Sequence, residues 1–126
     1  MDRKKILIVD DEELTLMLTE NILSQRYDTQ RALSGQEAID LYEQSKPDMI
    51  LSDLMMPNMN GFEMLEILQE RHGRKIPIIF MTAHESEEVE LQSLTSGAVD
   101  FIRKPLKADV LLKSVNSIMD RLSGIA

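Results

Sequence analysis

Short apolar runs alternate along this chain with segments of helical character, and this alternation constrains the fold more than any other feature. The predicted strands are Ile6–Val9, Thr29–Leu33, a run that ends at Asp53, Pro77–Thr82 and Val99–Ile102. Most of these runs lack polar alternation, which is typical of strands buried on both faces of a parallel sheet. Thr29–Leu33 carries Gln30 and Arg31 and is therefore expected near an edge. The alternation predicts an α/β fold with helices on both faces of a parallel sheet.

A helical segment follows each predicted strand. Helices are expected after the acids at 10–13, from Ser34, from Phe62 to His72, over Glu85–Ser96 and over Ala108–Leu122. Ser34 and Glu37 have the spacing of a capping box, and Asp11 or Glu12 is expected to cap the first helix. The core stripe predicted for the first helix is Leu14, Leu18 and Ile22, with Leu16, Met17 and Leu23 outside it. The stripe predicted for the last helix is Leu111, Val115, Ile118 and Leu122, with Met119 outside it.

The composition excludes several classes of protein. Acidic residues outnumber basic ones by 22 to 14, and no run of lysines or arginines stands out, which argues against a nucleic-acid partner or a membrane surface. The chain has no cysteine, which excludes disulfides and thiolate metal sites and agrees with a cytoplasmic location. The first apolar run is too short for a signal sequence or a membrane span. At 126 residues, the chain is expected to form a single domain over residues 1–126.

Polar residues stand where the predicted strands end. Asp10 and Asp11 follow the first strand, Asp53 ends the third, Thr82 ends the fourth and Lys104 follows the fifth. Because the carboxyl ends of parallel strands share one edge, where ligands bind in such folds, we expect these side chains to meet. Two carboxylates about 4 Å apart repel by on the order of 4 kcal/mol at an effective dielectric of about 20, and a hard divalent cation relieves this. An oxygen-only ligand set favours Mg²⁺.

The residue types suggest separate roles within this group. Asp11 and Asp53 are the expected direct ligands of the ion, and Asp10 is expected to hold a metal-bound water. Lys104 supplies a fixed positive charge and Thr82 a hydroxyl. A carboxylate nucleophile, a cation, a lysine and a hydroxyl donor are what phosphoryl transfer to an aspartate requires. We therefore expect an acyl phosphate on Asp53; the alternative, in which Asp10 and Asp11 merely cap a helix, leaves the other residues unexplained.

Several motifs occur in a fixed order along the chain. They are Ile8-Val9-Asp10-Asp11-Glu12, Asp53-Leu54-Met55-Met56-Pro57 with Gly61, Met81-Thr82-Ala83, and Phe101-Ile102-Arg103-Lys104-Pro105. Their order and spacing over Ile6–Leu122 resemble the receiver domains of response regulators in two-component (phosphorelay) signalling, chemotaxis regulators among them. The resemblance implies a flavodoxin-like, doubly wound sheet of five parallel strands in the order 2-1-3-4-5. Five helices would complete the three α/β/α layers.

The resemblance also implies roles for individual residues. Asp53 would accept a phosphoryl group from a sensor histidine kinase or a histidine phosphotransfer protein, with one Mg²⁺ that Mn²⁺ can replace. The backbone carbonyl of Met55 would complete the metal site. Thr82 and Phe101 would form a switch pair, and the Lys104–Pro105 peptide bond would be cis. Met55 and His84 would flank the phosphoryl group and tune its hydrolysis; an ordinary loop histidine is the alternative at His84.

Apolar residues beyond the needs of the core suggest partner surfaces. Leu14, Leu16 and Met17, near the mouth of the site, are expected to dock a kinase helix. The fourth helix, fifth strand and fifth helix are expected to form a phosphorylation-sensitive surface for a downstream target, an effector domain or a second copy of the chain. Scattered surface hydrophobics are the alternative interpretation.

Other functions fit the sequence less well than this one. An aspartate-nucleophile phosphatase has related chemistry but needs a second Asp two residues after the nucleophile, where this chain has Met55. A constitutive, unphosphorylated interaction domain would not need an intact acidic site together with Thr82 and Lys104. A flavin-binding flavodoxin is excluded because acids follow the first strand, where a phosphate-cradling loop would be needed. We therefore expect a binding module that promotes its own phosphorylation and dephosphorylation, and no enzyme that acts on an external substrate.

Overall fold

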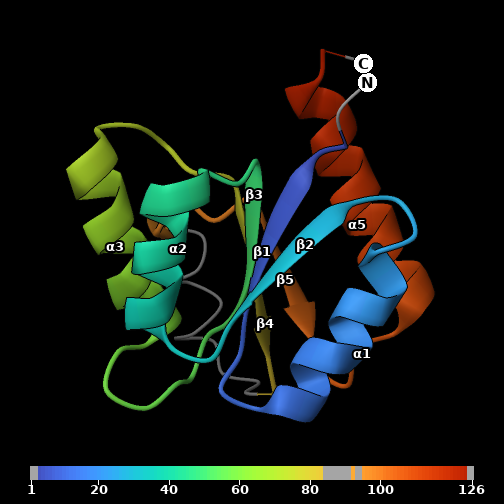
Figure 1. The fold of residues 1–126 in the computed structure, drawn as a ribbon, viewed down its shortest axis with the longest axis horizontal. Coiled ribbons are helices and arrows are strands. Elements are labelled where there is room, and N and C mark those ends of the chain that lie inside the picture. The colour runs from blue at the N-terminus through green and yellow to red at the C-terminus, as the bar shows by residue number, and fades with distance from the viewer. Residues whose placement is uncertain (1–2, 84–91, 93–94, 125–126) are drawn as a thin grey trace.

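A single parallel sheet forms the centre of the protein. The computed structural model describes residues 3–83, 92 and 95–124. The strands are β1 (Lys5–Val9), β2 (Asp28–Ala32), β3 (Met49–Asp53), β4 (Ile78–Thr82) and β5 (Asp100–Arg103). All neighbouring strands pair in parallel, in the order β2-β1-β3-β4-β5 (Figure 1). The predicted strand order is confirmed, and β2 lies at the edge as expected.

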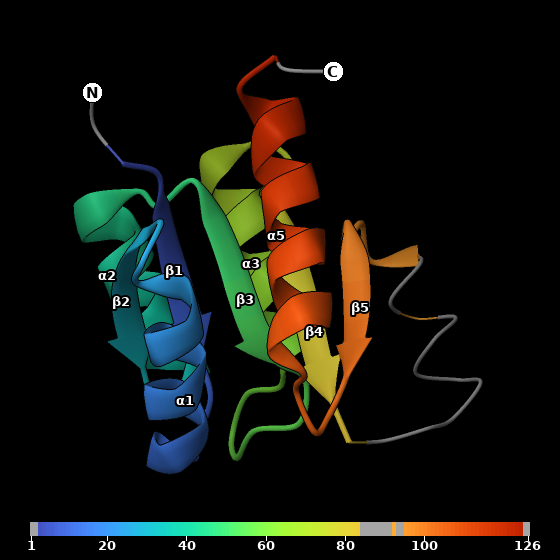
Figure 2. The same ribbon diagram turned by 90° about the vertical axis from the view of Figure 1, so that its right-hand side faces the viewer.

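Helices cover both faces of the sheet. Those with described bounds are α1 (Glu13–Leu23), α2 (Gly35–Ser45), α3 (Gly61–His72) and α5 (Ala108–Leu122). The pair α1 and α5 packs on one face, and the pair α2 and α3 packs on the other (Figures 1 and 2). The helix predicted over Glu85–Ser96 falls mostly outside the described residues, so it stays a prediction.

Each layer has its own core, because successive strand residues point to opposite faces. Leu7 and Val9 of β1 belong to the core under α2 and α3, whereas Ile6 and Ile8 belong to the core under α1 and α5. All four are fully buried. β1 therefore lies inside the protein on both faces, which explains the unbroken apolar run in the sequence.

The buried face of α1 differs from the predicted one. Leu14 and Leu18 are 65% and 57% exposed, whereas Leu16 and Leu23 are 2% and 0% exposed. The helix is apolar around most of its circumference, so periodicity alone allowed two stripes. The stripe that packs on the sheet consists of Leu16, Thr19 and Leu23. The buried Thr19 hydroxyl donates a hydrogen bond to the Thr15 carbonyl at 2.7 Å, so its polar group has a partner.

The last turn of α5 also departs from prediction. Leu111, Val115 and Ile118 are buried as expected, but Met119 takes the fourth core position and Leu122 is 47% exposed. α5 extends past the amino-terminal edge of the sheet, so its last turn has no strand to pack against (Figure 2). The predicted stripe therefore held for all but this last turn.

Side chains define the starts of α2 and α3. The Ser34 hydroxyl accepts a hydrogen bond from the Glu37 backbone N–H at 3.1 Å, which confirms one of the two bonds of the predicted capping box. A complete capping box starts α3, where Asn60 and Glu63 bond to each other's backbone N–H groups at 2.9 Å. The second box was not predicted, although its Asn-x-x-Glu spacing is visible in the sequence.

Candidate functional site

The residues predicted to form the site meet at the carboxyl edge of the sheet. Asp10 directly follows β1, Asp53 is the last residue of β3, Thr82 ends β4, and Lys104 directly follows β5. Ligand oxygens of Asp10, Asp11 and Asp53 all lie within 4.8 Å of one another. The parallel topology therefore brings together acids that are far apart in the sequence.

Lys104 links two of these carboxylates. Its Nζ lies 2.8 Å from Asp10 Oδ2 and 3.4 Å from Asp53 Oδ2. The second oxygen of Asp10 accepts a hydrogen bond from the Glu12 backbone N–H at 2.9 Å. Asp10 is fully buried, so these two contacts compensate for the loss of water around its charge. Asp10, and not the predicted Asp11 or Glu12, therefore contacts the backbone at the start of α1, where Glu12 is the N-cap without a side-chain bond.

The surroundings of Asp53 disfavour the negative charge on its carboxyl group. Burial, and next the charge of Asp10, raise the pKa of the Asp53 carboxyl, and Lys104 offsets only part of this. Burial lowers the pKa of Lys104, but its hydrogen bond to Asp10 and the charges of Asp53 and Asp10 together raise that pKa above its usual value. The site therefore holds Lys104 as a cation while it disfavours the ionised form of Asp53.

The donor set fits a hard divalent cation. The three clustered carboxylates supply only oxygen, and a single lysine does not neutralise them all. Both oxygens of Asp10 already have hydrogen-bond partners, whereas Asp11 is exposed and the contact between Asp53 and Lys104 is longer, at 3.4 Å. Asp11 and Asp53 are thus the carboxylates best able to contact an ion directly, with Asp10 next to it.

Gly61 and Ser52 lie close to the backbone carbonyl of Asp53, and the sequence predicted no role in the site for either. A Cβ at Gly61 would lie 2.7 Å from the ring of Phe80 and 3.0 Å from the carbonyl oxygen of Asp53, so only glycine lets α3 begin this close to β3. The buried Ser52 hydroxyl donates to the same Asp53 carbonyl at 2.8 Å. The hydrogen bond of Ser52 could have been predicted, because a serine stands out inside an apolar strand. The close approach at Gly61 could not, because it depends on how α3 packs against β3 and β4.

The remaining predicted residues lie around this centre. Thr82 is buried at the end of β4, and Phe101 lies half-buried on β5, packed against the core and in register with Phe80. The Lys104–Pro105 peptide bond is cis, as predicted. Met55 is exposed, two residues beyond Asp53. His84 lies outside the described residues, so its predicted role stays a prediction.

The docking surface predicted on α1 needs one correction. Leu14 and Met17 are exposed, but Leu16 is buried in the core beneath α1 and cannot contact a partner. Leu18, which was assigned to the core, is exposed instead. The exposed apolar face of α1 thus consists of Leu14, Met17 and Leu18.

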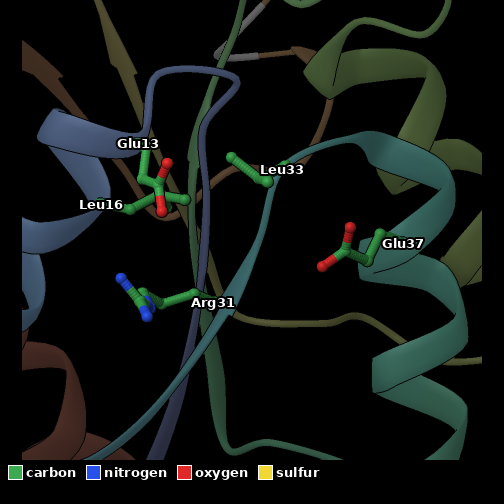
Figure 3. A pocket seen from close by; sticks show the side chains of 5 residues that line it. All are labelled: Glu13, Leu16, Arg31, Leu33 and Glu37. Atoms are coloured by element: carbon green, nitrogen blue, oxygen red, sulfur yellow. The ribbon is translucent and has the colours of Figure 1, made fainter.

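A separate hollow of about 160 Å³ lies between α1 and α2 beside the edge strand β2 (Figure 3). Glu13 and Leu16 reach it from α1, Arg31 from β2, Leu33 from the following connection and Glu37 from α2. The residues gathered at the carboxyl edge are not among those that line it. We therefore assign it no part in the chemistry of the site.

The strand order, the helices on both faces and the acidic cluster define a flavodoxin-like α/β domain with three clustered carboxylates at the carboxyl edge of its sheet. The family model for the response regulator receiver domain matches residues 6–116. The chain therefore belongs to the receiver domains of two-component response regulators. Among the residues that the structure describes, no helix has the length and apolar character to cross a bilayer.

Solved structures resemble the whole chain. A CheY-like response regulator receiver domain protein from Methanospirillum hungatei JF-1 is 31% identical, with a TM-score of 0.89 over 99% of this chain and 100% of that one. The chemotaxis protein CheY4 of Vibrio cholerae is 28% identical, with a TM-score of 0.86 over 91% and 98% of the two chains. The receiver domain of a signal transduction histidine kinase from Syntrophus aciditrophicus is 34% identical, with a TM-score of 0.82 over 97% and 92%.

Proposed function

We propose that this protein accepts a phosphoryl group on Asp53 and changes a protein-binding surface in response. The observation that carries the proposal is the position of Lys104, whose ammonium group lies between Asp10 and Asp53 beside the carboxylate cluster. A purely structural ion pair would need one carboxylate, whereas this arrangement concentrates acid beyond what the lysine neutralises. The surplus suits a site that holds Mg²⁺ and an anionic phosphoryl group together.

Asp53 is the nucleophile in this proposal. One of its carboxylate oxygens attacks the phosphorus of a phosphohistidine; the new O–P bond forms as the N–P bond breaks, and the imidazole leaves with the electron pair of that bond. Mg²⁺, when bound by Asp11, Asp53 and the Met55 carbonyl with Asp10 nearby, supplies positive charge to the phosphoryl oxygens. Lys104 holds a second positive charge at the same edge.

Thr82 and Phe101 form the proposed switch. Thr82 ends β4 at the same edge as Asp53, and the Thr82 hydroxyl can donate to a phosphoryl oxygen after a small movement. Phe101 lies half-buried on the neighbouring strand β5, so it can turn further inward when Thr82 moves away. The consequence is a changed surface over β5, α5 and the predicted helix Glu85–Ser96.

The exposed apolar face of α1 is the proposed contact for a sensor histidine kinase or a histidine phosphotransfer protein. Leu14, Met17 and Leu18 are exposed on α1, which begins two residues after Asp11, so a partner that docks on this face brings its histidine toward the carboxyl edge. The switched surface binds a downstream target, an effector domain or a second copy of the chain. We place the protein in the cytoplasm as one receiver domain over residues 1–126 that acts on no external substrate.

The test is phosphorylation by a small-molecule phosphodonor, read by intact mass. The wild type and Asp53→Asn are incubated with and without Mg²⁺. A gain of one phosphoryl group that requires both Mg²⁺ and Asp53 supports the proposal. If the wild type gains no phosphoryl group under any of these conditions, the protein is a constitutive binding domain, and a gain that persists in Asp53→Asn rejects Asp53 as the acceptor.

A further inference from the structure

A basic pocket lies at the amino-terminal edge of the sheet, opposite the acidic site. It is formed by the start of β1, the α2–β3 and α3–β4 connections and the end of α5, which Figure 1 shows at one end of the molecule. Its lining includes four basic side chains, Lys4, Lys46, Arg74 and Lys75, and one acidic side chain, Asp48. The whole chain has a net charge of −8, so this concentration of positive charge runs against the rest of the surface.

Most of this positive charge is not neutralised by the chain itself. Asp48 accepts a hydrogen bond from the Lys5 backbone N–H at 2.8 Å and lies 4.0 Å from the Lys4 ammonium, so its carboxylate is already engaged. Within the part of the chain that the structure describes, Lys46, Arg74 and Lys75 form no ion pair. An anion that enters the pocket therefore meets three cations without displacing a carboxylate from any of them.

The pocket is held in shape by the protein. Arg74 donates a hydrogen bond to the Tyr42 hydroxyl at 2.7 Å, and the Tyr42 ring is buried in the core. This bond fixes the guanidinium group at the pocket wall, so part of the ordering needed for binding is already present. Pro47, Pro77 and Leu122 supply apolar walls. The cavity of about 410 Å³ is within the range of small-molecule sites.

Helix ends offer an alternative reason for one of these cations. Lys46 is the C-cap of α2, in a left-handed conformation, and a cation there offsets the negative end of the helix dipole. Arg74 and Lys75 lie beyond the C-cap of α3 at Gly73, and Lys4 precedes β1, so the same reason does not cover them. A role limited to helix capping predicts effects on stability and none on anion binding.

We propose that the basic pocket lined by Lys4, Lys46, Arg74 and Lys75 binds a small phosphate-bearing anion. Three unpaired cations match the charge of two or three phosphate groups, and guanidinium and ammonium groups are the usual protein donors to phosphate. A hollow of this volume with apolar walls favours a small ligand over an extended acidic chain. The pocket is separated from Asp53 by the length of β3, about 13 Å, so it is a second site distinct from the acidic one.

The proposal is tested by calorimetric titration of the full chain in metal-free buffer at low ionic strength. Sodium tripolyphosphate and adenosine triphosphate are the probes, and an acidic peptide, hexaglutamate, is the comparison. Without a divalent cation, the acidic edge repels all three, so binding reports the basic pocket. If adenosine triphosphate binds more tightly than tripolyphosphate, the apolar walls contribute to binding. If the two bind equally, the phosphate groups alone are recognised. Either result supports the proposal.

Matched variants locate the site. The pocket variant is Lys46→Gln with Lys75→Gln, whose side chains form no hydrogen bond or ion pair among the described residues. The control is Lys107→Gln with Lys113→Gln, which removes the same charge from the start of α5. We expect about tenfold weaker binding in the pocket variant and less than about twofold in the control. Circular dichroism confirms that each variant folds, and Arg74→Gln repeats the test independently.

Three results would overturn the proposal. The first is that neither phosphate probe binds at low ionic strength. The second is that both variants weaken binding equally, which indicates non-specific attraction to net charge. The third is that hexaglutamate binds more tightly than both phosphates. None of these outcomes depends on phosphorylation of Asp53, so failure here leaves the proposed receiver function intact.

Discussion

Asp53 carries a charge that the fold disfavours. Its pKa is raised by burial and by Asp10, so the folded chain holds a proton on this carboxyl more tightly than the unfolded chain does. Stability therefore falls as pH rises from the ordinary aspartate value, about 3.9, through the raised value in the folded protein. A site that needs an ionised Asp53 at neutral pH is thus maintained at the expense of stability.

The substitution Asp53→Asn should therefore stabilise the metal-free protein at neutral pH. We expect a gain on the order of 1 kcal/mol, reduced by solvent at the open side of the site. The gain should disappear at about pH 3, where the wild-type carboxyl is protonated in both states. Urea unfolding of the two proteins across this pH range measures the difference, and Mg²⁺ should narrow it by stabilising the wild type. An equal or lower stability of the variant at neutral pH would contradict the electrostatic account.

Met55 is expected to set the lifetime of the acyl phosphate. Its side chain is exposed two residues beyond Asp53 and has no group that can orient a water molecule. Met55→Asn supplies such a group, so we expect the variant to lose its phosphoryl group faster. Loss of the added mass with time after removal of the phosphodonor gives both rates. Equal or slower loss from the variant would refute this role.

Single residues were predictable where chemistry restricts the residue type. Asp10, Asp11, Asp53 and Lys104 were found because charged groups at the ends of apolar strands need a reason to be there. Gly61 was visible in the sequence as part of a motif, but its closeness to Phe80 and the Asp53 carbonyl depends on how α3 packs and could not be predicted. Thr82 was found in the same way, as a hydroxyl at the end of a strand, whereas the switch roles of Thr82 and Phe101 rest on the resemblance to receiver domains.

At the scale of elements, Gly61 joins α3 to the site. Gly61→Ala places a methyl group against the Phe80 ring and the Asp53 carbonyl, so α3 or the end of β3 has to shift. We expect a loss of about 1–3 kcal/mol in the free energy of unfolding. Because Asp53 ends β3, the rate of phosphorylation should fall as well. Chemical denaturation and intact mass measure the two effects; wild-type values for both would show that the contact carries no strain.

The two sides of α1 predict opposite effects of substitution. Leu16→Ala removes a buried side chain and should cost about 2–5 kcal/mol of stability, with little effect on kinase recognition in the folded fraction. Met17→Glu changes an exposed side chain, so stability should stay within about 0.5 kcal/mol while transfer from a phosphorylated histidine protein slows. Transfer as fast as that of the wild type would argue against docking at α1. Phosphorylation by the small-molecule donor is the control, since it needs no docking.

The sequence pattern predicted the positions of the helices and strands more accurately than it predicted which side of each helix is buried. All five strands and the helices with described bounds were predicted close to their observed positions, because apolar runs and turn residues delimit them. The buried side of α1 was wrong because leucine and methionine surround that helix, and only tertiary packing decides between its stripes. The buried stripe predicted for α5 was wrong at Leu122, because the sheet ends before the helix does.

At the scale of the whole molecule, the sheet separates two edges of opposite character. The carboxyl edge has three clustered carboxylates, two of which contact Lys104, and the amino-terminal edge has a pocket lined by four basic side chains and one carboxylate. The first edge was predictable because parallel strand ends meet by topology. The second was not, because Lys4, Lys46 and Lys75 come from three separate segments of the chain that no local pattern relates.

The most direct test of the central claim is whether phosphorylation of Asp53 changes the protein beyond the site. Amide ¹H–¹⁵N spectra are recorded with a phosphodonor and Mg²⁺ for the wild type and for Asp53→Asn. The account predicts that the resonances of Thr82, Phe101 and residues along β5 and α5 move in the wild type and stay in place in the variant. Changes confined to the residues that touch the phosphoryl group, or identical changes in Asp53→Asn, would contradict it.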